Sequence, residues 1–190
     1  MNFIKTGIQG LTIIKPHVYT DSRGYFYEAF REHEFIKNGI NEKFVQDNVS
    51  RSIRNTVRGL HYQIGDYAQG KLCQVFYGRV LDVAVDIRFG SPTFGKYHAV
   101  ELSDENKKMF WISPGFAHGF SVLSDWAVFY YKCTGYYNKE SERTIYSLDP
   151  DLKIDWKVTN PILSDKDRNG ELIKNIKKDF FHNTDEYLEE

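Results

Sequence analysis

The segment Arg79–Arg88 has the two-residue period of a strand whose two faces differ in kind, and this period constrains the fold more than any other feature of the chain. Apolar side chains at 81, 83, 85 and 87 share one face, and the mixed set at 80, 82, 84, 86 and 88, which includes Asp82 and Asp86, lies on the other. A period of two predicts a β-strand. The apolar run 72–77, ended by Gly78, predicts that the two segments form a hairpin. We expect both aspartates to be exposed on a solvated sheet face or, in a barrel, to face a polar lumen.

Short strands are expected along most of the chain. The aromatic share of 16% suits strands and a ligand cavity better than a helical bundle. A short helix is predicted at 32–38, before Gly39, and a closing helix at about 171–180, while Ser164 and Asp167 have the spacing of a capping box. An antiparallel sandwich or barrel is therefore predicted, with further strands at 10–17, 24–30, 97–102, 108–112, 119–123 and 127–134.

Length and charge limit the possible organisation and partners. The 190 residues contain no repeat or Pro/Gly/Ser-rich linker, so we expect a single domain spanning 1–190 with a loose acidic tail at about 183–190. The 25 basic and 26 acidic side chains nearly cancel, which argues against binding to nucleic acid or to a membrane surface. Cys73 and Cys133 lie in apolar surroundings and the N-terminus has no long apolar stretch, so reduced cysteines and a cytoplasmic location are expected.

Two glycine-punctuated segments each contain a histidine. His61 lies in Arg58–Gln63 and His118 in Pro114–Phe120, in a chain with six histidines. If both line one cavity with Lys71 and a tyrosine, they form a proton-transfer site for a carbon acid next to a carbonyl. The alternative is that both are core histidines with satisfied hydrogen bonds and that Lys71 is a surface charge.

Other polar segments allow two interpretations. Residues 46–48 form either a polar turn or a strand on which Gln46 and Asn48 share a face. Four tyrosines within 130–137 pack in the core, or one of them acts as an acid with its pKa lowered by a nearby cation. Metal-binding cupins carry a His-x-His pair, but Gln63 stands two residues after His61, so neither a metal nor another cofactor is expected.

Taken together, the motifs resemble those of the dTDP-4-dehydrorhamnose 3,5-epimerases. Eleven segments appear in the order expected for that family and span nearly the whole chain: 21–28, 46–50, 57–63, 69–71, 82–88, 91–95, 102–106, 114–120, 131–132, 154–156 and 163–167. The resemblance implies a mainly β, cupin-type antiparallel jelly roll without metal. It also implies a homodimer in which the N-terminal strand region of one subunit helps to build the site of the other.

Residue roles follow from the same resemblance. His61 would be the base, paired with Asp167, and Tyr131 the acid, while Lys71 would help to hold the nucleotide sugar. The chemistry adds a further role for Lys71, which, aided by His118, would stabilise the oxyanion. Tyr137 would stack on thymine, and the remaining substrate-binding positions would be Arg23, Phe26, Glu28, Gln46, Asp47, Asn48, Arg58, His118, Glu142 and Lys166.

The expected chemistry suits these residues. C3 and C5 of a 4-keto-6-deoxyhexose both flank the ketone, so one base and one acid on opposite faces can invert each centre through an enolate without a cofactor. The resemblance implies that the product is dTDP-4-dehydro-L-rhamnose, for dTDP-L-rhamnose synthesis. The alternatives are a 3- or 5-monoepimerase, a 3,4-ketoisomerase on a related nucleotide sugar, or a non-catalytic sugar-binding cupin.

Overall fold

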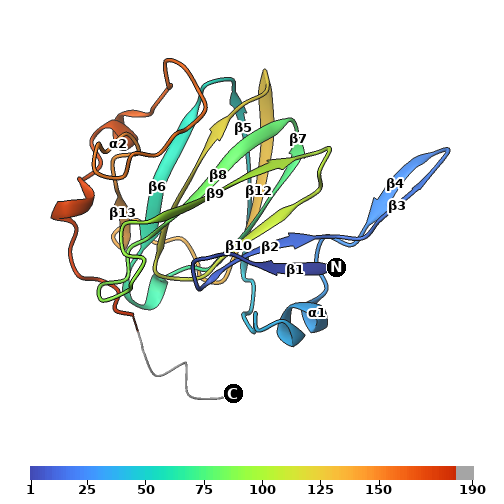
Figure 1. Cartoon of the computed structure of the whole chain (residues 1–190), viewed down its shortest axis with the longest axis horizontal. Coiled ribbons are helices and arrows are strands. Elements are labelled where there is room, and N and C mark those ends of the chain that lie inside the picture. Colours follow the sequence, from blue (N-terminus) through green and yellow to red (C-terminus); the bar gives the residue numbers. More distant parts are fainter. Residues whose placement is uncertain (183–190) are drawn as a thin grey trace.

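A computed structural model describes residues 1–182 of the chain (Figure 1). The predicted loose tail at 183–190 lies outside the described residues. Two antiparallel sheets make up most of the molecule, as the sequence predicts. The six-stranded sheet has the order β1 (Asn2–Lys5), β2 (Leu11–Lys15), β10 (Met109–Ile112), β7 (Lys71–Tyr77), β12 (Trp126–Cys133) and β5 (Gln46–Ile53). The five-stranded sheet has the order β13 (Glu142–Thr144), β6 (Val57–Gln63), β11 (Phe116–Val122), β8 (Arg79–Asp86) and β9 (Tyr97–Ser103).

Helices are few and short. The predicted helix at 32–38 is confirmed as α1 (Glu32–Lys37), and α2 (Asp165–Arg168) and the 3₁₀ turn η1 (Gly65–Tyr67) are single turns. The predicted helix at 171–180 is wrong, because only the 3₁₀ turn η2 (Ile173–Asn175) forms there. The Ile173 amide donates to Asp149 Oδ2 at 2.6 Å, and Ile176 has an extended backbone. Within 1–182, no helix is long and apolar enough to cross a membrane.

The predicted hairpin between the run 72–77 and the strand after Gly78 is also wrong. Strand β7 pairs with β10 and β12, whereas β8 pairs with β9 and β11, so the chain passes from one sheet to the other at Gly78. Gly78 has φ +77°, and a Cβ there would lie 2.3 Å from the Trp126 carbonyl oxygen. Glycine is needed for this crossover, which has the same sequence signature as a hairpin turn.

Both faces of β8 are covered. Val83, Val85 and Ile87 pack under the segment that follows β13, in a cluster with Leu152, Trp156 and Ile173. The opposite face of the strand lies between the two sheets, where Val80 and Ala84 join the main core. Asp82 and Asp86 are both completely buried, so the expected solvated face is wrong. The sequence alternation in 79–88 predicts that β8 has two different faces. It does not predict that the C-terminal segment covers one of these faces.

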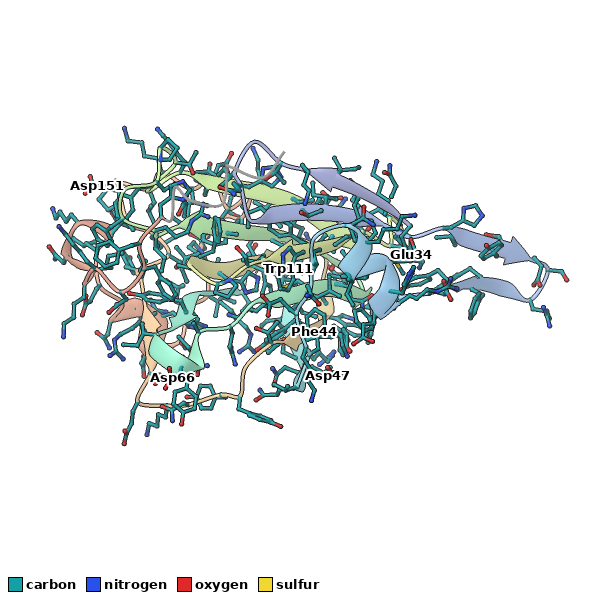
Figure 2. The ribbon with its side chains drawn as sticks, turned by 90° about the horizontal axis from the view of Figure 1, so that it is seen from below. Glu34, Phe44, Asp47, Asp66, Trp111 and Asp151 are labelled. Carbon is teal, nitrogen blue, oxygen red and sulfur yellow. The ribbon has the colours of Figure 1, made fainter. Side chains whose placement is uncertain are left out.

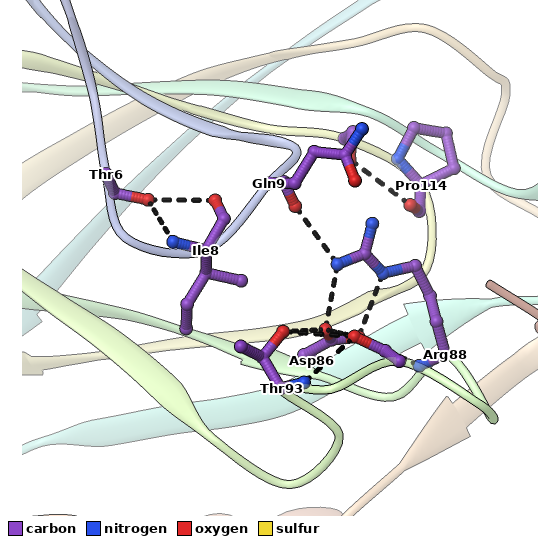
Figure 3. Close-up of polar contacts among 9 residues, drawn as sticks. Thr6, Ile8, Gln9, Asp86, Arg88, Thr93 and Pro114 are labelled. Atoms are coloured by element: carbon purple, nitrogen blue, oxygen red, sulfur yellow. Dashed lines mark hydrogen bonds and ion pairs between the residues drawn. The ribbon is translucent and has the colours of Figure 1, made fainter. Parts of the chain in front are cut away.

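Asp86 carries a structural network at the end of β8 (Figure 3). It accepts hydrogen bonds from Arg88 Nε at 2.9 Å and from the Ser91 and Thr93 hydroxyls at 2.6 Å each. Burial alone would raise the pKa of Asp86, but these hydrogen bonds outweigh it and hold the pKa below its ordinary value. Arg88 also donates to the Gln9 carbonyl at 3.0 Å, which ties β8 to the β1–β2 turn.

The hairpin of β3 (Val18–Asp21) and β4 (Gly24–Tyr27) extends away from both sheets (Figures 1 and 2). Its aromatic side chains face solvent, with Tyr19, Tyr25 and Phe26 between 57% and 66% exposed. Such a group of large exposed apolar side chains marks an interaction surface.

Candidate active site

One end of the sandwich contains two adjoining cavities of about 250 and 390 Å³. They share the lining side chains Asn48, His61, Lys71, Tyr131, Tyr137 and Glu142. A separate cavity of about 420 Å³ beside Arg88 and Trp111 contains none of the predicted site residues. The sequence-predicted chemistry is therefore concentrated in the paired cavities, with walls supplied by both sheets.

His61 and Asp167 form a hydrogen-bonded pair at the cavity wall. His61 Nε2, on β6, lies 2.6 Å from Asp167 Oδ1, on α2, and the side chains are 28% and 4% exposed. Burial would raise the pKa of Asp167, but the hydrogen bonds of His61 and Ser164 and the charges of His61 and Lys166 lower it below its ordinary value. The carboxylate is therefore ionised and can hold the imidazole in one tautomer.

His118 forms a second pair beside the first. The Cα atoms of His118 and His61 are register partners across β11 and β6. His118 Nε2 lies 2.6 Å from Asp82 Oδ1, a partner that was not identified from the sequence. Burial is the main cause that lowers the pKa of His118, despite Asp82, so this imidazole is neutral at pH 7.

The close approach of β6 and β11 depends on Gly119. A Cβ on Gly119 would lie 2.5 Å from the Arg58 carbonyl oxygen and 3.2 Å from Gly59 Cα. The ladder between the two strands shifts register between His118 and Phe120. Glycine at this position therefore permits the contact that brings both histidines to the same cavity.

Cys73, Asp82 and His118 form a group with the donor types of a metal site. Their ligand atoms lie within 4.8 Å of one another, and Cys73 Sγ is 3.7 Å from His118 Nε2. Tetrahedral metal–ligand bonds of about 2.1 Å place two ligand atoms roughly 3.4 Å apart, whereas the His118 and Asp82 atoms are at hydrogen-bond distance, 2.6 Å. Burial raises the pKa of the Cys73 thiol well above its ordinary value, which disfavours the thiolate. The group therefore fits a hydrogen-bonded cluster better than a metal.

Tyr131 lies on the wall opposite His61. It comes from β12, in the six-stranded sheet, whereas His61 belongs to the five-stranded sheet. Burial raises the pKa of Tyr131, and Cys133 and Cys73 add to the effect, whereas Arg58 opposes it. The expectation of a pKa lowered by a cation is therefore wrong, because desolvation of the phenolate dominates. The hydroxyl keeps its proton at neutral pH.

Lys71 is buried, with 9% exposure, at the start of β7. Its Nζ donates to the His61 carbonyl at 3.5 Å and lies 6.0 Å from the centre of the Tyr131 ring. The interpretation of Lys71 as a surface charge is wrong. The ammonium group is instead a cation placed between the two cavity walls.

Tyr130 points to the other side of its sheet. Its hydroxyl donates to Asp47 Oδ2 at 3.1 Å, and its ring stacks on Phe76 at 4.7 Å between centroids. Asp47 also pairs with Lys132 at 2.9 Å. Asp47 therefore lies on the outer face of β5 and is not brought into the cavities with the other predicted residues.

Gln46 and Asn48 lie on a strand, β5, and not in a turn. Gln46 Nε2 donates to Asn48 Oδ1 at 3.0 Å, and Gln46 Oε1 accepts from the Tyr137 amide at 2.9 Å. Tyr137 is 53% exposed, and its hydroxyl donates to Glu142 Oε2 at 3.2 Å. Lys166 pairs with Glu142 at 2.6 Å. These residues form the more open part of the site.

Two polar side chains of the site were not identified from the sequence. Gln63 is 5% exposed; its Nε2 donates to the Tyr67 and Tyr136 carbonyls, and its Oε1 accepts from the Asn138 amide at 2.6 Å. It thus fixes the loop that presents Tyr137. Ser52 accepts a hydrogen bond from Arg58 Nε at 2.9 Å and orients that guanidinium group. Gln63 could have been found from the sequence, because it stands two residues after His61 on the same strand and therefore shares its face.

Comparison with known proteins identifies the family. The family model for dTDP-4-dehydrorhamnose 3,5-epimerase matches residues 5–175. The chain belongs to this family. A dTDP-4-dehydrorhamnose 3,5-epimerase of Shigella flexneri is 52% identical over 182 residues, covering 95% of this chain and 99% of the relative. A dTDP-4-dehydrorhamnose 3-epimerase of Streptomyces niveus is less similar, 36% identical over 88% of this chain and 81% of the relative.

The fold is shared with solved structures of the same epimerase family. The crystal structure of a Legionella pneumophila 3,5-epimerase in complex with dTDP-4-keto-L-rhamnose has a TM-score of 0.92 and 51% identity, covering 96% of this chain and 98% of that one. This likeness confirms the cupin-type jelly roll and identifies the chain as an isomerase of the epimerase class. The resemblance drawn from the eleven sequence segments is confirmed.

Besides Asp47, three of the residues that the family resemblance assigns to substrate lie away from the cavities. Arg23 is at the tip of the β3–β4 hairpin and pairs with Asp21 at 2.6 Å, and Phe26 is on the same hairpin. Glu28 follows β4 and pairs with Arg31. Within residues 1–182, none of these three side chains lines the two cavities.

The epimerase should not depend on a bound metal. Because His118 and Asp82 already satisfy each other at hydrogen-bond distance, prolonged treatment with a strong chelator should leave the rate of epimerisation unchanged. Elemental analysis of the purified protein should find no stoichiometric metal. Activity that is lost on chelation and restored by one specific ion would contradict this interpretation of the Cys73, Asp82 and His118 cluster.

Proposed function

We propose that this chain converts dTDP-4-dehydro-6-deoxy-D-glucose into dTDP-4-dehydro-L-rhamnose by inverting C3 and C5, as a step in dTDP-L-rhamnose synthesis. The supporting observation is that a carboxylate-bound histidine, His61, and a protonated tyrosine, Tyr131, come from opposite sheets and line the same cavities. A substrate ring between them meets a base on one face and an acid on the other. The high similarity to 3,5-epimerases supports the same reaction.

His61 removes the proton. Its Nε2–H donates to Asp167, so Nδ1 holds the lone pair that accepts a proton from C5 or C3. The C–H bonding pair moves into the ring and the C4 carbonyl becomes an enolate oxygen. Asp167 stabilises the imidazolium that forms, because its carboxylate is ionised, buried and at hydrogen-bond distance.

Lys71 and Tyr131 complete each inversion. The buried ammonium of Lys71 lies between the walls and stabilises the negative charge that develops on the C4 oxygen. Tyr131 then donates its proton to the carbon from the opposite face, and the enolate collapses to the ketone. Solvent returns a proton to the tyrosinate and removes one from the imidazolium, so each centre is inverted with no net consumption of protons.

The nucleotide lies in the open part of the site. Arg58 and Lys166 both line the larger cavity and provide positive charge for the diphosphate. Tyr137 is half exposed on a loop held by Gln46 and Gln63, and its ring offers a flat surface for the thymine base. Neither Arg58 nor Tyr137 is needed for proton transfer, so binding and chemistry use separate groups.

Deuterium incorporation distinguishes this reaction from its rivals. We expect incubation with dTDP-4-dehydro-6-deoxy-D-glucose in deuterated water to place deuterium at both C3 and C5, because both protons exchange through an enolate. NMR of the product measures this directly. Deuterium at one position alone would identify a monoepimerase, and a shift of the ketone to C3 would identify a 3,4-ketoisomerase. No deuterium would indicate a sugar-binding cupin or a different substrate.

The acid can be tested by exchanging one hydroxyl at a time. Tyr131→Phe should allow His61 to form the enolate, so deuterium still enters the substrate, but formation of the doubly inverted sugar should fall about a hundredfold or more. Tyr130→Phe is the matched control, since Tyr130 lies on the outer face of the same strand. If Tyr130→Phe is the damaging change and Tyr131→Phe is silent, the acid is assigned to the wrong residue.

We also propose that the single domain works as a homodimer in the cytoplasm. The hairpin that carries Arg23 and Phe26 extends away from both sheets (Figure 1), and neither residue lines the cavities of its own chain, so they can reach a site only in a second copy. The outer face of the six-stranded sheet carries exposed apolar side chains that a second copy would cover: Val49, Ile53, Phe76 and Tyr77. The charges at the hairpin tip and the apolar sheet face suit such an interface.

Mixing two inactive variants tests whether the hairpin acts in the partner's site. The His61→Ala chain lacks the base but has a normal hairpin, whereas the Arg23→Ala chain has the base but an altered hairpin. If Arg23 serves the other subunit, unfolding and refolding the two chains together should restore activity through mixed dimers. Each variant refolded alone is the control. If the mixture is no more active than the two separate samples, Arg23 acts in its own subunit or not at all.

A further inference from the structure

Ser164 makes two hydrogen bonds to one residue, Asp167. As the N-cap of α2, its Oγ accepts from the Asp167 amide at 3.2 Å, which confirms the capping-box spacing seen in the sequence. The same Oγ donates its proton to Asp167 Oδ2 at 2.8 Å. The other carboxylate oxygen, Oδ1, is the one that lies 2.6 Å from His61 Nε2.

We propose that Ser164 is a positioning residue for epimerisation, and that the cap of α2 extends the His61–Asp167 pair to a chain of three side chains. The inference rests on the proposed role of His61 as the base. Ser164 does not touch the substrate. It fixes the rotamer of the Asp167 carboxylate, and through it the ring of His61.

The short length of α2 makes the cap important. The helix has four residues, Asp165–Arg168, and a helix of one turn has no stability of its own. Its position relative to β6 therefore depends on contacts at its ends. Because one hydroxyl binds both the amide and the carboxylate of Asp167, the start of the helix and the direction of the carboxylate are set together.

Ser164 also affects the charge balance of the pair. Its hydroxyl is one of the groups that lower the pKa of Asp167, after the hydrogen bond and charge of His61. Removing this donor leaves more negative charge on the carboxylate, which then holds a proton on the His61–Asp167 pair more tightly. The pair must be free of that proton to act as a base, so activity should begin at a higher pH.

Other charged groups around the pair stay in place when Ser164 is changed. Lys166 lies on α2 itself and Glu142 on β13, where the two are paired. From the strands packed against His61, the facing groups are Lys71 on β7, His118 on β11 and Tyr131 on β12. A change in pH dependence on substitution of Ser164 therefore reports the serine hydroxyl.

Three variants separate the cap from the hydrogen bond to the carboxylate. Ser164→Thr keeps both functions. Ser164→Asp keeps the cap, because its carboxylate accepts from the Asp167 amide, but it cannot donate to Asp167 and adds a like charge. Ser164→Ala loses both. Full pH profiles of kcat and kcat/KM should be measured for the wild type and for each variant.

We expect Ser164→Thr to match the wild type. Ser164→Ala and Ser164→Asp should lower kcat roughly tenfold at neutral pH with little change in KM, since the diphosphate is held elsewhere. The acidic limbs of their pH profiles of kcat and kcat/KM should move to higher pH. The shift should be larger for Ser164→Asp than for Ser164→Ala because of the added charge. If Ser164→Asp is as active as the wild type with an unmoved acidic limb, Ser164 only caps the helix and the proposal is overturned.

The coupling between Ser164 and His61 can be measured without the proposed reaction, by an NMR pH titration of the His61 ring in the substrate-free protein. Its titration should move to higher pH in Ser164→Ala and Ser164→Asp and stay unchanged in Ser164→Thr, whatever the enzyme does to a sugar. A wild type without epimerase activity would overturn the proposed function but not this coupling. A His61 titration that is the same in all four proteins would overturn the coupling, even if the enzyme is active.

Discussion

The hydrogen bond between His61 and Asp167 is the contact on which the rest of the site depends. At 2.6 Å, with the carboxylate 4% exposed, it joins β6 of the five-stranded sheet to a single helical turn more than a hundred residues later in the chain. The C-terminal segment must therefore fold over the outer face of the five-stranded sheet before the base is complete. Burial of Leu152, Trp156 and Ile173 provides the stabilisation for that step.

The two sheets divide the chemistry between them. Strand β6 presents the base and β12 the acid, so the distance between the layers of the sandwich sets the space for a sugar ring, and Lys71 supplies the positive charge between the walls. Burial raises the pKa of Tyr131, so the tyrosine keeps its proton. Burial would also raise the pKa of Asp167, but its hydrogen bonds lower that pKa and the aspartate keeps its negative charge. The low-polarity interior thus keeps the proton on Tyr131, whereas the hydrogen bonds and charges around Asp167 keep its carboxylate ionised despite burial.

Local patterns predicted most of the strands, helix α1 and the capping box, because alternation, glycine stops and cap spacing are short-range signals, but they did not predict β1, β3 or β13. They could not predict contacts between distant segments. The burial of Asp82, the crossover at Gly78 and the raised pKa of Tyr131 all depend on which layer covers which face. The family resemblance supplied the list of expected catalytic and substrate-binding residues, and the structure brings most of these residues together in the two cavities. Asp47 and the hairpin residues Arg23 and Phe26 lie elsewhere within the single chain.

The most direct measurement of the central claim is hydrogen exchange by His61→Ala. Wild type and variant would be compared in deuterated water for deuterium entry at C3 and C5, and for affinity toward dTDP. Because the base acts on the sugar while the nucleotide is held by other groups, the variant should bind dTDP with nearly wild-type affinity and lose at least about a hundredfold in exchange at both carbons. Exchange at a wild-type rate in His61→Ala would show that another group removes the protons.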